Sequence, residues 1–180
     1  MVYFQKVSFL VLAVLFITGC ASTVNRNTVS IKEERVQVLS TQGISKVSLE
    51  LNSKAKEKLA DNSNFNSDAL LRKINSTLQS NRYLKPGGST NTSIEITITN
   101  IRVRSGASAI MLGFLAGADY ITGDVAIKEN GKLIDKFEVD VNYAWGGAMG
   151  DTDTRMNWMY ESFSNKMTEE IKRLIPLAKN

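Results

Sequence analysis

The side chains of this chain that could take part in catalysis are mainly carboxylates. The sequence contains no histidine and one cysteine, so the commonest general base is missing and the usual zinc sites cannot be built. Asp119, Asp124, Glu138 and Asp140 fall in segments that read as neighbouring strands, where two carboxylates could pair as they do in glycosidases. Acidic residues on the solvent face of a sheet are the ordinary arrangement. We therefore expect no catalytic residue and no enzyme activity.

Motifs for metal and phosphate binding fail at defined positions. Asp151-Thr152-Asp153 begins like a calcium loop, but Met156 stands where the loop needs glycine and Ser162 where it needs glutamate. Gly113 and Gly117 are not followed by the Gly-Lys-Ser/Thr of a phosphate-binding loop. The sequence thus predicts neither a metal site nor a cofactor.

The single cysteine ends a segment with the pattern of a secretion signal. Lys6 precedes an apolar run over residues 7–17 that only Ser8 interrupts, and small residues follow. This run is shorter than the about 20 apolar residues that a membrane-spanning helix needs. Ile17-Thr18-Gly19-Cys20 resembles the lipobox of bacterial lipoproteins. That resemblance implies cleavage before Cys20, lipid on its sulfur and acylation of the new amino terminus.

The same resemblance implies a location in the cell. Ala21 and Ser22 follow the cysteine, without the aspartate that retains lipoproteins in the inner membrane. The implied location is the periplasmic leaflet of the outer membrane, with the lipid on Cys20 as the membrane partner. Loss of the signal peptide removes Lys6 from the 22 basic residues and none of the 18 acidic ones. The small and scattered positive excess predicts no nucleic-acid partner.

Hydropathy patterns divide the chain into three parts. We expect a signal peptide over residues 1–19, a lipidated amino terminus with a polar tether over 20–45, and a single domain over 46–180. Alternating residues predict strands over 46–51, 92–104, 119–128 and 133–143. Helical spacing predicts one helical region in two pieces, over 53–60 and 67–80, and a last helix over 154–177.

These elements predict an α+β fold in the order β-α-β-β-β-α. Since each element has one apolar side, the expected architecture is a mostly antiparallel sheet of about four strands with two helices packed on one face. In the strand over 92–104, strict alternation places Ile94 and its partners on one face and Ile101 and Val103 on the other. Asn130-Gly131 predicts a type I′ hairpin turn.

Two uncharged segments are candidates for an interaction. Residues 105–118 place small residues at every fourth position, namely Ala109, Gly113 and Gly117, with apolar residues such as Phe114 between them. As a helix, this segment would let another helix approach closely. Alternatively it is a connection folded over the sheet edge, with its glycines in turns.

The second segment, Trp145 to Gly150, leads into the last helix. Within that helix Trp158 falls opposite the apolar stripe, so it either covers the glycines of this segment or is an exposed anchor of an interface. Arg155 could bind a carboxylate or phosphate of a ligand, or pair with Asp151.

Several segments resemble a known family. Arg102-Val103-Arg104-Ser105, the glycine-containing connection, residues 120–128, 143–147 and 155–160 look like bacterial lipoproteins grouped as domain of unknown function 4410. The resemblance covers about residues 45–175, and it implies a small α/β lipoprotein domain with no established activity.

We therefore expect a non-enzymatic, membrane-anchored envelope lipoprotein that acts as an accessory or interaction module for another envelope component. Two alternatives stay open: a self-assembling oligomer, and a binding module for a small or polymeric periplasmic ligand, with Arg102, Arg104 or Arg155 as charge partner. The expected interaction residues are Gly113, Phe114, Gly117, Trp145, Gly146, Gly147, Arg155 and Trp158.

Overall fold

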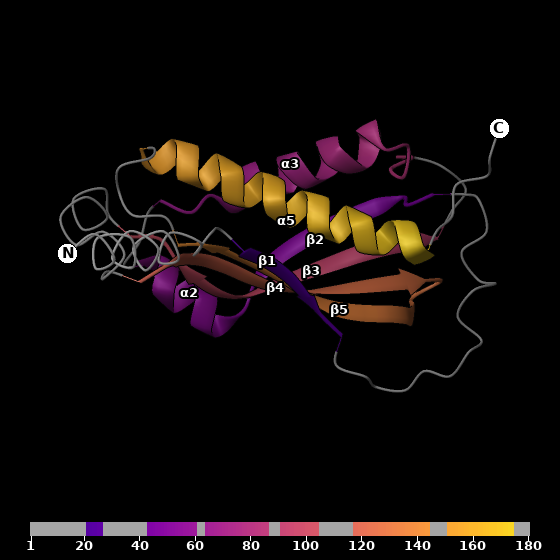
Figure 1. Ribbon diagram of the computed structural model, residues 1–180. Coiled ribbons are helices and arrows are strands. Elements are labelled where there is room, and N and C mark those ends of the chain that lie inside the picture. Colours follow the sequence, from indigo (N-terminus) through magenta and orange to yellow (C-terminus); the bar gives the residue numbers. More distant parts are fainter. Residues whose placement is uncertain are drawn as a thin grey trace, which may run out of the picture.

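The computed structural model describes residues 21–26, 43–60, 64–86, 91–104, 117–144 and 151–174, which form an α+β fold. Their five strands are β1 (Ala21–Asn25), β2 (Lys46–Leu51), β3 (Thr92–Arg102), β4 (Asp119–Glu129) and β5 (Lys132–Tyr143). Their three helices are α2 (Ser53–Ala60), α3 (Ser67–Ser80) and α5 (Thr152–Leu174). Helices α3 and α5 lie side by side on one face of the sheet, and the short helix α2 lies on the other (Figure 1).

The strands form one mixed sheet in the spatial order β1-β5-β4-β3-β2. Neighbouring strands are antiparallel except β2 and β3, which are parallel. A parallel pair needs a long crossover connection, and here α2 and α3 supply it. The expected α+β class is confirmed, with one strand more than expected, one parallel pair and a further helix on the outer side.

The core lies between the sheet and helices α3 and α5, so we call the sheet face beneath these helices the core face and the opposite one the outer face. Alternate residues of the three central strands point into this core, as strand periodicity requires. The buried residues of the sheet include Ile94, Ile96, Ile98, Ile121, Val125, Ile127, Phe137, Val139 and Val141. Facing them are Leu70, Ile74 and Leu78 of α3 and Met156, Met159, Phe163, Met167 and Ile171 of α5.

One strand departs from strict alternation. The register of β3 against β4 shifts between Ile98 and Asn100, where a β-bulge inserts an extra residue. After the bulge, Ile101 and Val103 return to the core face and are buried. The expectation that they point to the opposite face from Ile94 is therefore wrong.

The hairpin between β4 and β5 follows the sequence signal closely. Asn130 and Gly131 both have positive φ, 51° and 78°, as a type I′ turn demands. Asparagine and glycine tolerate this left-handed conformation better than other residues. The predicted two-residue turn is confirmed.

The helices begin at polar caps. The Thr154 N–H donates to Asp151 Oδ1 over 2.8 Å at the start of α5, and the Ala69 N–H donates to Asn66 Oδ1 over 2.9 Å at the start of α3. Of the helices in the part of the chain that the structure describes, none is both long enough and apolar enough to cross a bilayer.

Strand β1 occupies residues expected to belong to a tether. Its sequence, Ala-Ser-Thr-Val-Asn, has little apolar character, yet it pairs with β5 from Ala21↔Asn142 to Asn25↔Glu138. The pairing partner and the contacts of Arg26 supply the stabilisation that the local sequence lacks. Residues 27–42 of the expected tether lie outside the described residues, whereas residues 43–45 are described and Ile44 among them is buried in the core.

Candidate functional site

Several strand ends meet at one end of the sheet. Arg102 of β3 pairs with Tyr120 of β4, Tyr120 pairs with Asn142 of β5, and Asn142 pairs with Ala21 of β1. This row of four residues crosses the sheet where β3 and β5 end and where β1 and β4 begin. We call it the Ala21 end of the sheet.

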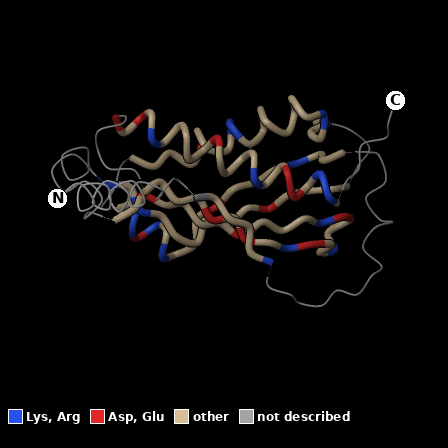
Figure 2. Tube along the Cα trace, viewed as in Figure 1, with Lys and Arg blue, Asp and Glu red and all other residues tan. Residues whose placement is uncertain are grey.

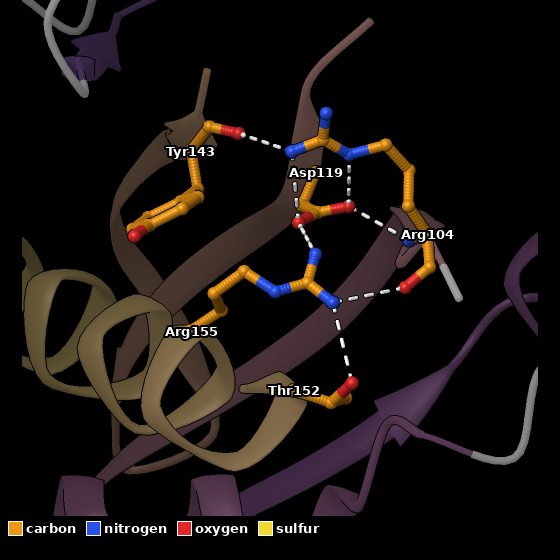
Figure 3. A network of polar contacts seen from close by, with 5 residues as sticks. All are labelled: Arg104, Asp119, Tyr143, Thr152 and Arg155. Carbon is orange, nitrogen blue, oxygen red and sulfur yellow. Dashed lines mark hydrogen bonds and ion pairs between the residues drawn. The ribbon is translucent and has the colours of Figure 1, made fainter. Parts of the chain in front are cut away.

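A buried ion cluster lies at this end, on the core face (Figure 3). The Asp119 carboxylate accepts hydrogen bonds from the Arg104 backbone N–H at 2.7 Å and from Arg104 Nε at 3.0 Å, both on Oδ1. Its other oxygen accepts from Arg104 Nη2 at 3.3 Å and from Arg155 Nη1. The side chains of all three residues are at most 2% exposed.

The two guanidinium groups also bind the surrounding backbone. Arg155 Nη2 donates to the Arg104 carbonyl oxygen at 3.1 Å and to Thr152 Oγ1 at 3.2 Å. Arg104 Nη2 reaches the Tyr143 carbonyl oxygen at 3.5 Å. The cluster thus ties the exit of β3, the start of β4, the end of β5 and the first turn of α5 together.

These contacts indicate that the ion cluster has a structural role. The cluster joins two arginines to one aspartate, and within the described residues Arg155 Nε is a buried donor without a hydrogen-bond partner. Ions removed from water need such dense pairing, and a partner left alone is strongly unfavourable. The cluster therefore positions the strand ends and α5 relative to each other.

The structure locates several of the predicted site residues. Arg155 binds Asp119 through its side chain, whereas the Asp151 carboxylate caps α5, and the Thr154 N–H lowers the pKa of this carboxyl group. Trp158 is half-buried and packs edge-on against the Tyr143 ring, with ring centroids 5.4 Å apart.

Gly117 has a backbone conformation that explains its residue type. Its φ is 78°, and a Cβ added there would lie 2.7 Å from Arg102 Nη1. A Gly117→Leu change would therefore strain the fold and could not serve as a fold-neutral probe of an interaction. Cys20, Gly113, Phe114, Trp145, Gly146 and Gly147 lie outside the described residues.

The four acidic residues considered for catalysis are divided between the two faces of the sheet. Asp119 is buried on the core face, whereas Asp124 and Glu138 are register partners on the outer face. Asp124 forms a 2.7 Å ion pair with Lys136, and Asp140 accepts a hydrogen bond from Thr122. Among the described residues, no group of three or more potential ligands could hold a metal ion.

A second ion cluster, which the sequence analysis missed, fixes the other end of β1. Arg26 Nη1 lies 2.7 Å from Asp135 Oδ2, and its Nη2 lies 2.6 Å from Glu170 Oε2. The guanidinium also stacks over the Phe137 ring at 5.3 Å from the centroid. Glu170 falls three residues after Met167 on the buried side of α5, and a carboxylate at such a position is a signal that could have revealed the cluster.

These features define a small α+β domain whose mixed sheet carries two helices on one face and a buried ion cluster at one end. The family model for the domain of unknown function DUF4410 matches residues 22–147, and the chain belongs to this family. Among curated proteins, none matches the sequence.

Solved structures show distant similarity. A PelC variant dodecamer from Paraburkholderia phytofirmans has a TM-score of 0.47 and 9% identity, covering 88% of this chain and 100% of that one. Another PelC dodecamer from the same organism has a TM-score of 0.45 and 8% identity, covering 79% and 95%. An uncharacterised protein has a TM-score of 0.44 and 12% identity, covering 75% and 94%. At such values these similarities carry no argument about function.

Proposed function

We propose that this protein is a lipoprotein, held by lipid on Cys20 in the periplasmic leaflet of the outer membrane of a bacterium with two membranes. There its domain acts as a non-enzymatic module that binds another envelope component or a second copy of itself. The observation that carries the proposal is the position of the chain's single cysteine, directly after a signal-peptide pattern and directly before strand β1.

The fold supports this reading of the cysteine. A mature chain that starts at Cys20 loses none of the described strands, because β1 begins at Ala21. At the Ala21 end, the Asp119 carboxylate binds the side chains of Arg104 and Arg155 inside the core. This engagement supports a structural role for Arg104, Asp119 and Arg155 and leaves the interaction to other surfaces.

Membrane fractionation tests both the lipid anchor and the outer-membrane location. We expect the full-length protein, expressed in a bacterium with two membranes, in the outer-membrane fraction. An Ala21→Asp variant introduces the aspartate that retains lipoproteins in the inner membrane. This variant should move to the inner-membrane fraction. A Cys20→Ser variant should stay unprocessed. Equal distribution of the wild type and Ala21→Asp, or a soluble wild type, would contradict the proposed address.

Crosslinking in cells tests the interaction. We expect the wild-type protein, extracted in detergent after crosslinking, to run as a discrete species larger than the monomer. Mass spectrometry of that species identifies either a second envelope protein or further copies of this chain. A monomer alone, recovered under conditions that crosslink a known envelope complex, would count against an interaction module.

A further inference from the structure

The position of Cys20 fixes which end of the domain is nearest to the membrane, if the proposed lipid anchor holds. Consecutive Cα atoms are about 3.8 Å apart, so the lipidated residue lies within roughly 4 Å of the first residue of β1. Ala21 pairs with Asn142, one residue before the end of β5. The anchor therefore joins the sheet at the Ala21 end, with no spacer.

The two ends of the sheet are far enough apart to be distinguished. Strands β4 and β5 contain 11 and 12 residues, pair along their length and are joined by the Asn130-Gly131 turn at the end opposite to Ala21. At about 3.3 Å per residue, the turn lies on the order of 35 Å from the Ala21 end. One end can lie at the bilayer surface while the other stays in solvent.

Helix α2 lies on the outer face beside the anchor. Lys58 Nζ donates to Asn100 Oδ1 at 2.7 Å and to the Tyr120 hydroxyl at 3.0 Å, which fixes the helix against β3 and β4. Tyr120 belongs to the row of residues that ends at Ala21, two strands away. With neighbouring strands about 4.8 Å apart, this places Tyr120 and Ala21 on the order of 10 Å from each other.

The exposed surface of α2 carries more basic than acidic residues. Lys54, Lys56 and the single acid Glu57 are exposed, whereas Lys58 is half-buried against the sheet, and Figure 2 shows the basic residues of the helix in blue. Ala55 is buried against the sheet, while Lys54 and Lys56 are exposed. Clusters of lysine near a membrane attract the phosphate groups of anionic lipids.

We propose that the outer face at the Ala21 end, with α2 foremost, lies against the bilayer that holds the anchor, and that Lys54 and Lys56 bind the phosphates of anionic phospholipid headgroups. The inference rests on the proposed function, because it needs lipid on Cys20. It adds an orientation and a class of ligand to that proposal.

A fluorophore at each end of the sheet tests the orientation. Since the only native cysteine carries lipid, Glu57→Cys in α2 and Glu129→Cys beside the far turn each provide a unique thiol. The labelled, lipidated proteins are reconstituted in phosphatidylethanolamine–phosphatidylglycerol vesicles with a quencher on the headgroups. We expect several-fold stronger quenching at residue 57 than at residue 129. Equal quenching, or stronger quenching at residue 129, overturns the orientation.

A linker variant shows whether the missing spacer matters. About 12 Gly/Ser residues inserted between Cys20 and Ala21 would let the two ends of the linker lie on the order of 20 Å apart. This insertion should reduce the difference in quenching between residues 57 and 129. An unchanged difference would show that the direct junction does not set the orientation.

Lysine substitutions test the headgroup contact. In the Glu57→Cys protein, quenching should be stronger in vesicles containing phosphatidylglycerol than in pure phosphatidylcholine, and the change Lys54→Gln with Lys56→Gln should abolish that difference. The matched pair Lys132→Gln with Lys136→Gln, near the far turn, should retain it. Equal behaviour of the two double variants overturns the headgroup contact. The mass of the same preparations shows whether Cys20 carries lipid, so failure of the anchor and failure of the inference are distinguishable.

Discussion

At the scale of single residues, we expect Asp119 to contribute most to the stability of the fold. Its carboxylate binds two buried guanidinium groups, and the side chains of all three residues are at most 2% exposed. Removing its charge leaves Arg104 and Arg155 buried and repelling each other. The residue thus holds the Ala21 end of the sheet together without offering any group to solvent.

An Asp119→Asn change should therefore destabilise the protein strongly. We expect a loss of about 3–5 kcal/mol in the free energy of unfolding, as for other broken buried ion pairs. Urea denaturation of the full chain in detergent measures it. Asp124→Asn on the same strand removes a partly exposed pair with Lys136 and should cost less than about 1 kcal/mol. Equal losses would contradict a structural role for the cluster.

Tyr160 makes the free energy of unfolding change with pH in the alkaline range. Burial raises the pKa of its hydroxyl, although the hydrogen bond from the Asn66 N–H lowers it in part. Above a pH of about 10 the unfolded state loses tyrosine protons that the folded state keeps. The contribution of Tyr160 to the free energy of unfolding should thus be constant below this pH and decrease as the pH rises further.

A Tyr160→Phe variant should show a smaller decrease over this alkaline range. Tyr83, whose pKa burial also raises, accounts for part of the decrease that remains. Denaturation in urea at a series of pH values measures both slopes. Identical slopes for the wild type and the variant would show that Tyr160 does not contribute.

At the scale of elements, β1 shows what tertiary contacts add to a weak local signal. Its residues predict a polar tether, yet the strand completes the sheet edge because β5 offers a free row of backbone groups and Arg26 reaches two buried carboxylates. Such contacts join residues more than 100 positions apart in sequence. Local composition cannot report them.

An Arg26→Ala change should release β1. We expect amide exchange in residues 21–25 to accelerate by on the order of tenfold or more, because the strand end loses its attachment to Asp135 and Glu170. Hydrogen exchange followed by mass spectrometry measures this effect. Lys73→Ala, which removes an exposed pair with Glu161, should leave the exchange of β1 unchanged. Unchanged exchange in Arg26→Ala would contradict the role given to this cluster.

Elements with strong periodicity were predictable, and the irregular ones were not. The helix over the Met156–Ile171 stripe, the central strands and the Asn130-Gly131 turn follow from spacing alone. The bulge before Ile101 and the buried pairing of Arg155 depend on partners elsewhere in the fold. The sequence contained one signal of the buried ion cluster. Asp119 lies at the same alternating positions of β4 as Ile121 and Val125, which point to the core face. A charged residue in such a series predicts a buried partner.

At the scale of the whole molecule, the proposed lipid anchor is attached directly to the edge strand of the sheet. The domain belongs to the DUF4410 family, and strand β1 starts one residue after the cysteine of the lipobox-like segment. We propose that this direct junction lets the lipid anchor orient the domain, with helix α2 toward the bilayer.

The most direct test of this account is the intact mass of the protein extracted from the membranes of a bacterium that makes lipoproteins, with fragmentation of its amino-terminal peptide. We expect a chain that lacks residues 1–19 and carries a diacylglyceryl group on the Cys20 sulfur and an acyl group on its amino nitrogen. A chain with an unmodified Cys20, whether or not residues 1–19 are still attached, would contradict the lipid anchor and the orientation that depends on it.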